Sequence, residues 1–114
     1  MIFNLPLPPS VNQLYFNRKG GRAKTKLYED WITVARDALR KQKAIPIFGQ
    51  VSIEYVISEK SRCDLGNHEK ALTDLLVTHG ILEDDSKDHV RRISLEWSPD
   101  VSGVHVRIRD AWEI

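Results

Sequence analysis

The segment VSIEYVI, residues 51–57, most constrains the fold, because its large apolar side chains recur at every second position. Such alternation is typical of a β-strand with one buried face. The segments VRRISLEW (90–97) and VHVRIR (104–109) alternate in the same way, and the turn-rich SPDVSG between them predicts a hairpin. The opening IFNLP adds a short strand that Pro6 closes, so the sequence predicts four strands.

Two stretches between the predicted strands have the spacing of amphipathic helices. From Leu27 to about Gln42, apolar side chains recur on one face, with acidic residues in the first turn and basic residues at the end. A second helix is expected from Leu65 to His79, ended by the following glycine. Residues 10–26 are expected to form a long loop. The order β-α-β-α-β-β predicts an α/β (α+β) fold, a mixed four-stranded sheet with two helices packed on one face.

Length and composition limit the class of protein. At 114 residues, the chain is expected to form one domain, spanning 1–114. A single cysteine excludes an intrachain disulfide, and no apolar run approaches the roughly 18 residues of a membrane span. The first residues lack the features of a secretory signal, so a cytoplasmic location is expected. Gly20-Gly21 is not followed by the Lys-Ser/Thr of a phosphate-binding loop, and no organic cofactor is expected.

Charge is distributed unevenly along a chain whose net charge is only +1. The segment NRKGGRAKTK contains no acidic residue, and its basic residues are Arg18, Lys19, Arg22, Lys24 and Lys26. Acidic residues gather instead between 83 and 88, next to the third predicted strand. Separate patches of opposite sign favour a protein that binds a polyanion beside a cation. A solvated basic loop is the alternative explanation for the first patch.

Asp64 precedes the second predicted helix, where a carboxylate can cap free N–H groups. A rotation of about 100° per residue places Asn67, Lys70 and Asp74 on one side of that helix. A capped helix with a solvent-exposed Lys70–Asp74 pair is therefore the simplest explanation of these residues. The alternative is that Asp64 is a metal ligand.

Three adjacent acidic residues precede the third predicted strand: Glu83, Asp84 and Asp85. Adjacent carboxylates repel one another unless solvent or a cation neutralises them. If the strand that follows pairs beside 51–57, we expect its start to lie near the end of 51–57, and hence near Asp64. Oxygen ligands without cysteine or histidine indicate Mg²⁺ or Mn²⁺. Either ion could polarise a phosphate and activate water. With Lys70 to stabilise the developing charge, this is the chemistry of a phosphodiesterase.

Three short motifs follow one another along the chain. They are LPLPPSVNQLYFNRKGGR near the start, DLGN-x-x-K from Asp64 to Lys70, and the acid pair Asp84-Asp85. In order and distance they resemble the motifs of the RusA family of Holliday-junction resolvases, whose opening is LP-x-PPS-x-N followed by a basic loop. The resemblance covers most of the chain. It implies a mixed α/β homodimer that binds four-way junction DNA and cuts it symmetrically with Mg²⁺.

The resemblance also implies roles for single residues. Asp64 and Asp85 match the family's catalytic acids and metal ligands, Lys70 matches its catalytic lysine, and Asp84 is a further candidate ligand. The candidate DNA-binding residues are Asn12, Arg18, Lys19, Arg22, Lys24, Lys26, Arg62 and Asn67. Gly66 stands where the family's D-L-D-N motif has its second acid, and Asp84 or Glu83 is expected to supply the missing ligand.

Three functional hypotheses follow from these residues. The leading one is a Mg²⁺-dependent, structure-selective endonuclease, with Mn²⁺ as a substitute metal. The second is a non-catalytic junction-binding module that has lost cleavage together with the acid at Gly66. The third is a small interaction protein with a capped helix and solvated acids, which binds neither DNA nor metal.

Overall fold

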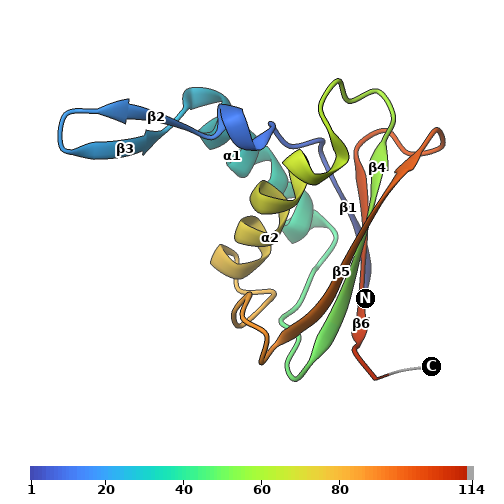
Figure 1. Cartoon of the computed structure of the whole chain (residues 1–114). Coiled ribbons are helices and arrows are strands. Elements are labelled where there is room, and N and C mark those ends of the chain that lie inside the picture. Colours follow the sequence, from blue (N-terminus) through green and yellow to red (C-terminus); the bar gives the residue numbers. More distant parts are fainter. Residues whose placement is uncertain (113–114) are drawn as a thin grey trace.

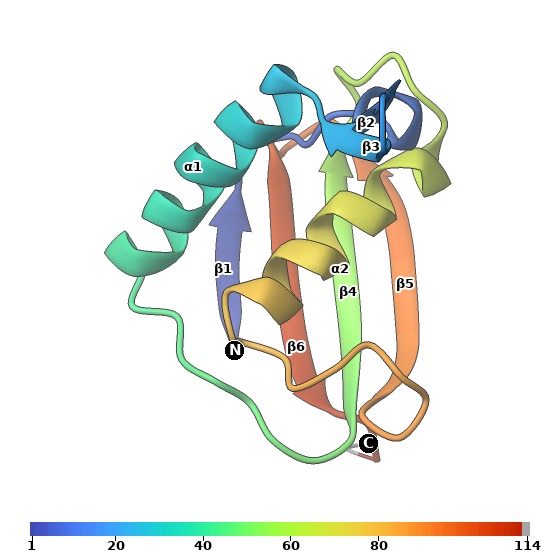
Figure 2. The same ribbon diagram turned by 90° about the vertical axis from the view of Figure 1, so that its left-hand side faces the viewer.

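The computed structural model describes residues 1–112 and contains a mixed four-stranded sheet with both helices on one face (Figures 1 and 2). The sheet has the spatial order β1-β6-β4-β5, so β1 and β5 are its edges. The predicted fold class is confirmed. The elements in chain order are β1 (Ile2–Leu5), the short 3₁₀ helix η1 (Val11–Gln13), β2 (Tyr15–Arg18), β3 (Gly21–Lys24), α1 (Lys26–Lys41), β4 (Val51–Ser58), the 3₁₀ helix η2 (Leu65–His68), α2 (Glu69–Thr78), β5 (Val90–Ser98) and β6 (Val104–Asp110).

Strand β4 lies in the middle of the sheet and decides its topology. It pairs in parallel with β5 on one side and antiparallel with β6 on the other. The predicted hairpin between β5 and β6 is therefore wrong, because β4 lies between them. The physical reason is that β4 is the most buried strand, and the central position removes both of its sides from water. The parallel β4–β5 connection passes through α2, as a crossover between parallel strands requires.

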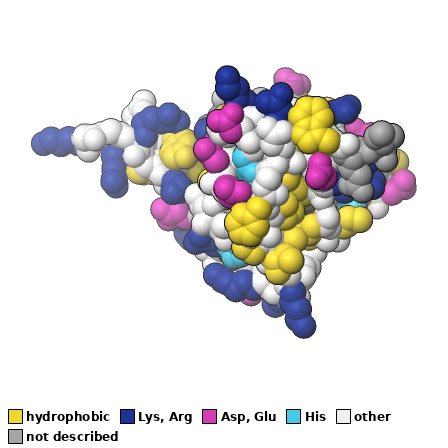
Figure 3. Space-filling view, turned by 90° about the horizontal axis from the view of Figure 1, so that it is seen from below, with side chains coloured by type: hydrophobic (Ala, Val, Ile, Leu, Met, Phe, Trp, Pro, Cys, Tyr) yellow, Lys and Arg dark blue, Asp and Glu magenta, His cyan; other side chains and the backbone are white. Residues whose placement is uncertain are grey.

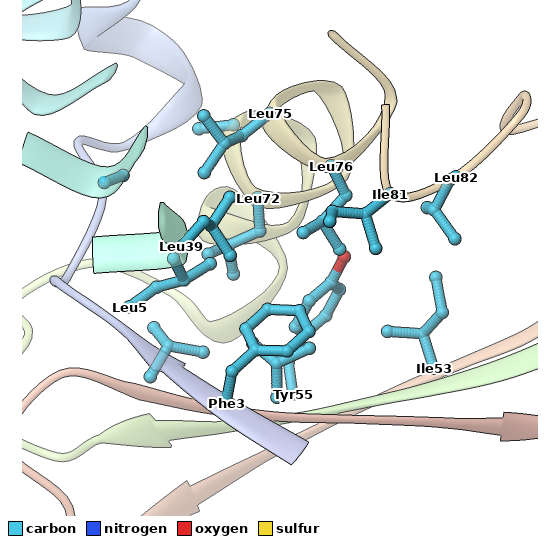
Figure 4. Close-up of a cluster of buried hydrophobic side chains, with 14 of the residues drawn as sticks. Phe3, Leu5, Leu39, Ile53, Tyr55, Leu72, Leu75, Leu76, Ile81 and Leu82 are labelled. Carbon is cyan, nitrogen blue, oxygen red and sulfur yellow. The ribbon is translucent and has the colours of Figure 1, made fainter. Parts of the chain in front are cut away.

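The core lies between the sheet and the two helices, and Figure 4 shows its side chains converging from β1, β4, α1 and α2. The alternation in β4 points Ile53, Tyr55 and Ile57 into this core, where they are fully buried. The Tyr55 hydroxyl is satisfied there, 2.9 Å from the Thr73 hydroxyl, which in turn donates to Glu69 at 2.7 Å. This chain of hydrogen bonds attaches the first two turns of α2 to the centre of the sheet. Burial raises the pKa of Tyr55, so its phenol stays neutral.

The expected loop at 10–26 is instead a two-stranded hairpin, formed by β2 and β3, that projects from the body of the protein (Figure 1). Its strands pair from Tyr15 with Lys24 to Arg18 with Gly21. Gly20 and Gly21 have φ angles of 88° and 139°, which side-chain-bearing residues rarely adopt. The Gly-Gly pair was the sequence signal for this turn. Within residues 1–112, no helix is long and apolar enough to cross a membrane.

Candidate active site and nucleic-acid interface

The β2–β3 hairpin carries a dense positive charge. Arg18, Lys19, Arg22 and Lys24 are all exposed on it, and Figure 3 shows Lys and Arg side chains along the projecting part of the molecule. No acidic residue interrupts the hairpin. A narrow basic projection of this kind is suited to contact with the phosphates of a nucleic acid.

Aromatic contacts fix the base of the hairpin to α1. The Tyr15 ring packs edge-on against Tyr28, with ring centroids 5.8 Å apart, and the Arg22 guanidinium lies 4.5 Å from the centre of the Tyr15 ring. Phe16 lies on the other face of the ribbon, opposite Ala23, and is 49% exposed. Of the two aromatic residues, Tyr15 is therefore a packing residue, and Phe16 is free to contact a ligand.

Asp64 lies at the N-terminal end of η2 with its side chain exposed. The carboxylate makes no capping hydrogen bond to the helix, so the predicted side-chain cap is not formed. The helical segment begins with a 3₁₀ turn, Leu65–His68, and becomes α-helical only at Glu69. Both carboxylate oxygens of Asp64 are consequently left for another partner.

His68 holds the loop that presents Asp64. Its imidazole is 2% exposed, its Nε2 lies 2.6 Å from the Ser61 hydroxyl, and that hydroxyl accepts the Cys63 N–H at 3.1 Å. The ring also packs edge-on against Trp97 of β5 at 6.4 Å. Within residues 1–112, Nδ1 of His68 has no hydrogen-bond partner. Sequence periodicity placed this histidine on the apolar face but did not indicate its contact with the loop.

The burial of His68 predicts a pH-dependent stability. Burial lowers the pKa of this imidazole below its ordinary value of about 6.5. Because the folded-state pKa is the lower one, the free energy of unfolding should be highest above about pH 6.5 and should fall as the pH drops through the folded-state value. Urea unfolding of the wild type and of His68→Gln between pH 7.5 and 5 measures this. The variant should lose less stability over that range, and equal losses would contradict the prediction. His79, whose pKa burial also lowers, is present in both proteins.

Lys70 forms the predicted ion pair with Asp74, with Nζ 3.2 Å from Oδ2. The hydrogen bond from Lys70 to Asp74 raises the pKa of the lysine, which is therefore fully charged near neutral pH. Lys70 is the second residue of α2, so its backbone lies at the Asp64 end of the helix, and the ion pair sets its ammonium beside Asp74, one turn further along. Asp74 was not among the predicted site residues.

Asp84 and Asp85 lie beyond the other end of α2 and are exposed. Asp84 accepts the Ser86 N–H at 3.0 Å, which lowers the pKa of this carboxyl. Asp85 borders a cleft of about 280 Å³ between α1 and α2, which Asp74 and Arg36 also line. Arg36 was not among the predicted site residues either.

The expectation that the start of β5 lies near Asp64 is wrong. Because β5 runs parallel to β4, it starts beside Val51, at the beginning of β4, whereas Asp64 follows the end of that strand. Asp64 directly precedes η2 and Asp85 follows α2 along the chain, so the two residues lie beyond opposite ends of α2, and a helix of 10 residues is about 15 Å long. Within residues 1–112 of one chain, no group of three or more His, Cys, Asp or Glu side chains is placed to hold a metal ion. The described part of a single chain therefore does not gather Asp64, Asp84 and Asp85 around one point.

The remaining candidate DNA-binding residues lie on η1, in the loop before Asp64, on η2 and at the start of α1. Asn12 is exposed on η1 at the base of the hairpin, and Arg62 is exposed in the loop before Asp64. Asn67 is half-buried within η2. Lys26 is exposed at the start of α1 but pairs with Asp30 at 3.1 Å. Most of the candidate DNA-binding residues thus lie on the hairpin or near the Asp64 end of α2, and Asp85 borders the cleft that Tyr15 and Lys24 at the base of the hairpin also line.

These features define a small α+β protein with a basic projecting hairpin and acidic side chains at both ends of one helix. The model of the endodeoxyribonuclease RusA family matches residues 6–109, nearly the whole chain, so the chain belongs to the RusA family. Members of this family are endodeoxyribonucleases, and family membership indicates a nuclease of the Holliday-junction resolvase type. No individually curated protein matches the chain.

Proposed function

We propose that the protein is a divalent-metal-dependent endonuclease that resolves four-way DNA junctions by paired, symmetric cleavage as a homodimer. The observation that carries this proposal is the position of Asp64 and Asp85 beyond opposite ends of α2. One chain offers two half-sites at separate places. Because the candidate ligands are all carboxylates, Mg²⁺ is the proposed metal and Mn²⁺ its substitute.

A second copy of the chain completes the site. A two-fold axis that sets α2 antiparallel to the partner's α2 brings Asp64 of one chain toward the partner's Asp85. The same axis creates a second, equivalent pair, since both chains of a two-fold dimer use the same surface. Two identical sites related by a two-fold axis match a four-way junction, which is resolved by two symmetric cuts.

The side chains at each site have separate tasks. Asp64 and the partner's Asp84 and Asp85 would hold the cation, which supplies activation of a phosphate and of water. Lys70 stabilises the negative charge that develops on the phosphate, because it is in the first turn of α2, within reach of the Asp64 end, and its ammonium stays protonated. Its partner Asp74 orients that ammonium in the free protein.

The hairpin supplies the contacts to DNA. Arg18, Lys19 and Lys24 are exposed and bind phosphates, which provides affinity without sequence choice and makes that affinity fall with rising salt. Phe16 is half-exposed on the opposite face from Arg22 and is placed to stack on a base that the branch point leaves without a stacking neighbour. The projection thus combines phosphate binding with an aromatic contact.

The test is incubation of a labelled four-way junction with the protein and Mg²⁺ or Mn²⁺. We expect the wild type to cut opposing strands at symmetric positions, EDTA to abolish the cuts, and Asp64→Asn and Asp85→Asn each to reduce the rate by at least about 100-fold. Both residues are exposed, so neither change should disturb folding.

Other results would overturn the proposal. Equal cutting by the variants would show that Asp64 and Asp85 are not in the site. Junction binding at low salt without nicking under any divalent metal would instead favour the non-catalytic binding module, for which the glycine at position 66 is the specific argument.

A further inference from the structure

Strand β5 is an edge of the sheet with apolar side chains that the helices cover only in part. Ile93 and Trp97 are 36% and 37% exposed, and Leu95 between them is half-buried. Their neighbours on β4 in the same register, Ile53, Tyr55 and Ile57, are fully buried. Strand β5 pairs with β4 alone and ends the sheet. The free side of β5 therefore combines unpaired backbone groups with an incompletely covered apolar row.

The sequence of β5 is self-complementary about its middle. Arg92 and Glu96 lie two residues on either side of Ser94, both are exposed, and neither forms an ion pair within residues 1–112. If two copies of β5 pair antiparallel with Ser94 opposite Ser94, Arg92 faces the partner's Glu96 twice. The same register sets Ile93 opposite the partner's Leu95 on the helix side. Opposite charges and apolar pairs directly across a strand pair are the contacts that stabilise antiparallel sheets.

We propose that β5 is the homodimer seam, pairing antiparallel with the partner's β5 about a two-fold axis at Ser94 to form one continuous eight-stranded sheet. The occupant of this edge is thus a second copy of the chain. The axis is perpendicular to the sheet, so both α2 helices stay on one face and run in opposite directions. They then cover the row of Ile93, Leu95 and Trp97 from both sides.

The proposal of this seam rests on the proposed function, because it explains how two chains could place Asp64 and Asp85 at the same end of the dimer. A two-fold axis at Ser94 sets the N-terminal end of α2 beside the C-terminal end of the partner's α2. Asp64 of each chain therefore lies at the same end of the dimer as the partner's Asp85. The two-fold axis that buries the exposed row thus also sets each Asp64 at the same end of the dimer as the partner's Asp85.

Charge reversal tests the register. Arg92→Glu sets two carboxylates opposite each other at both ends of the seam, and Glu96→Arg sets two guanidinium groups there. Each repulsion should raise the dimer dissociation constant at least about tenfold in sedimentation velocity. The double variant Arg92→Glu/Glu96→Arg should return to within about threefold of the wild type. A mixture of the two single variants should form heterodimers. The control is Phe48→Glu, at the most exposed large apolar side chain, 74% exposed on another surface, which should leave the dimer unchanged.

A disulfide locates the axis independently. In a Cys63→Ser background, Ser94→Cys should give a covalent dimer under mild oxidation, because directly opposite residues in an antiparallel pair are within disulfide reach. Ser102→Cys, in the exposed turn before β6, should not. A dimer that resists both charge reversals and cross-linking at residue 94, or that Phe48→Glu disrupts, would overturn the seam while leaving the dimeric nuclease intact. A protein that stays monomeric yet cuts junctions in pairs would overturn both proposals.

Discussion

A mixture of the Asp64→Asn and Asp85→Asn variants should nick four-way junctions although neither variant cuts them alone. In a mixed dimer with sites shared between chains, one site contains both substitutions and the other contains none. The intact site should cut one strand, so the product is a nicked junction rather than two resolved duplexes. If each chain instead held a complete site, both sites of the mixed dimer would carry a substitution and no strand would be cut.

The measurement uses differently tagged variants, coexpressed so that mixed dimers can be purified through both tags. Denaturing gels with each junction strand labelled in turn report which strands are cut. The reciprocal control pairs the wild-type chain with the double variant Asp64→Asn/Asp85→Asn. With shared sites, this dimer has no intact site and should be inactive, whereas with intrachain sites it should nick. A pattern in which the first mixture is inactive and the second nicks would contradict the shared site.

The fold was predictable to the extent that local patterns determine it. The alternation in VSIEYVI and the helical spacing after Leu27 correspond to β4 and α1 because burial on one face dictates both periods. The hairpin at Tyr15–Lys24 was missed because its exposed, charged strands bury almost no apolar surface and so lack the alternation of a packed strand. The order of strands across the sheet depends on contacts between distant segments, and the linker SPDVSG gave no sign that β4 would separate β5 from β6.

The candidate site was also predictable only in part: local patterns indicated its residues, but not which of them lie together. Residue types and spacing indicated Asp64, Lys70 and Asp85, and the structure leaves all three exposed to solvent. Their grouping was not predictable, because the direction of β5 relative to β4 decides on which end of α2 the second acid lies. No local signal in the sequence marks a parallel pair. If the site is shared between two chains, its formation depends on how β5 pairs with the partner's β5. The symmetric placement of Arg92 and Glu96 about Ser94 indicates such pairing only when β5 is known to be an edge strand.

Gly66→Asp should raise the rate of junction cleavage at limiting divalent metal by at least about tenfold. Position 66 is in η2 two residues after Asp64, and the added carboxylate would join Asp64 at the same end of α2. A further oxygen ligand with negative charge strengthens binding of a divalent cation, so the metal concentration for half-maximal rate should fall. The gain should shrink at saturating metal if Asp84 already completes the ligand set.

The backbone at residue 66 accepts the change without strain. A Cβ there meets no atom within 4 Å, and Gly66 is not among the positions with left-handed φ. The free energy of unfolding should therefore change by no more than about 0.5 kcal/mol, which separates an effect on the site from an effect on folding. Gly66→Asn is the matched control, because it adds the same volume and an oxygen but no charge. A metal titration of cleavage that is the same for Gly66→Asp, Gly66→Asn and the wild type would show that residue 66 does not face the cation, and that the carboxylates of Asp64, Asp84 and Asp85 suffice.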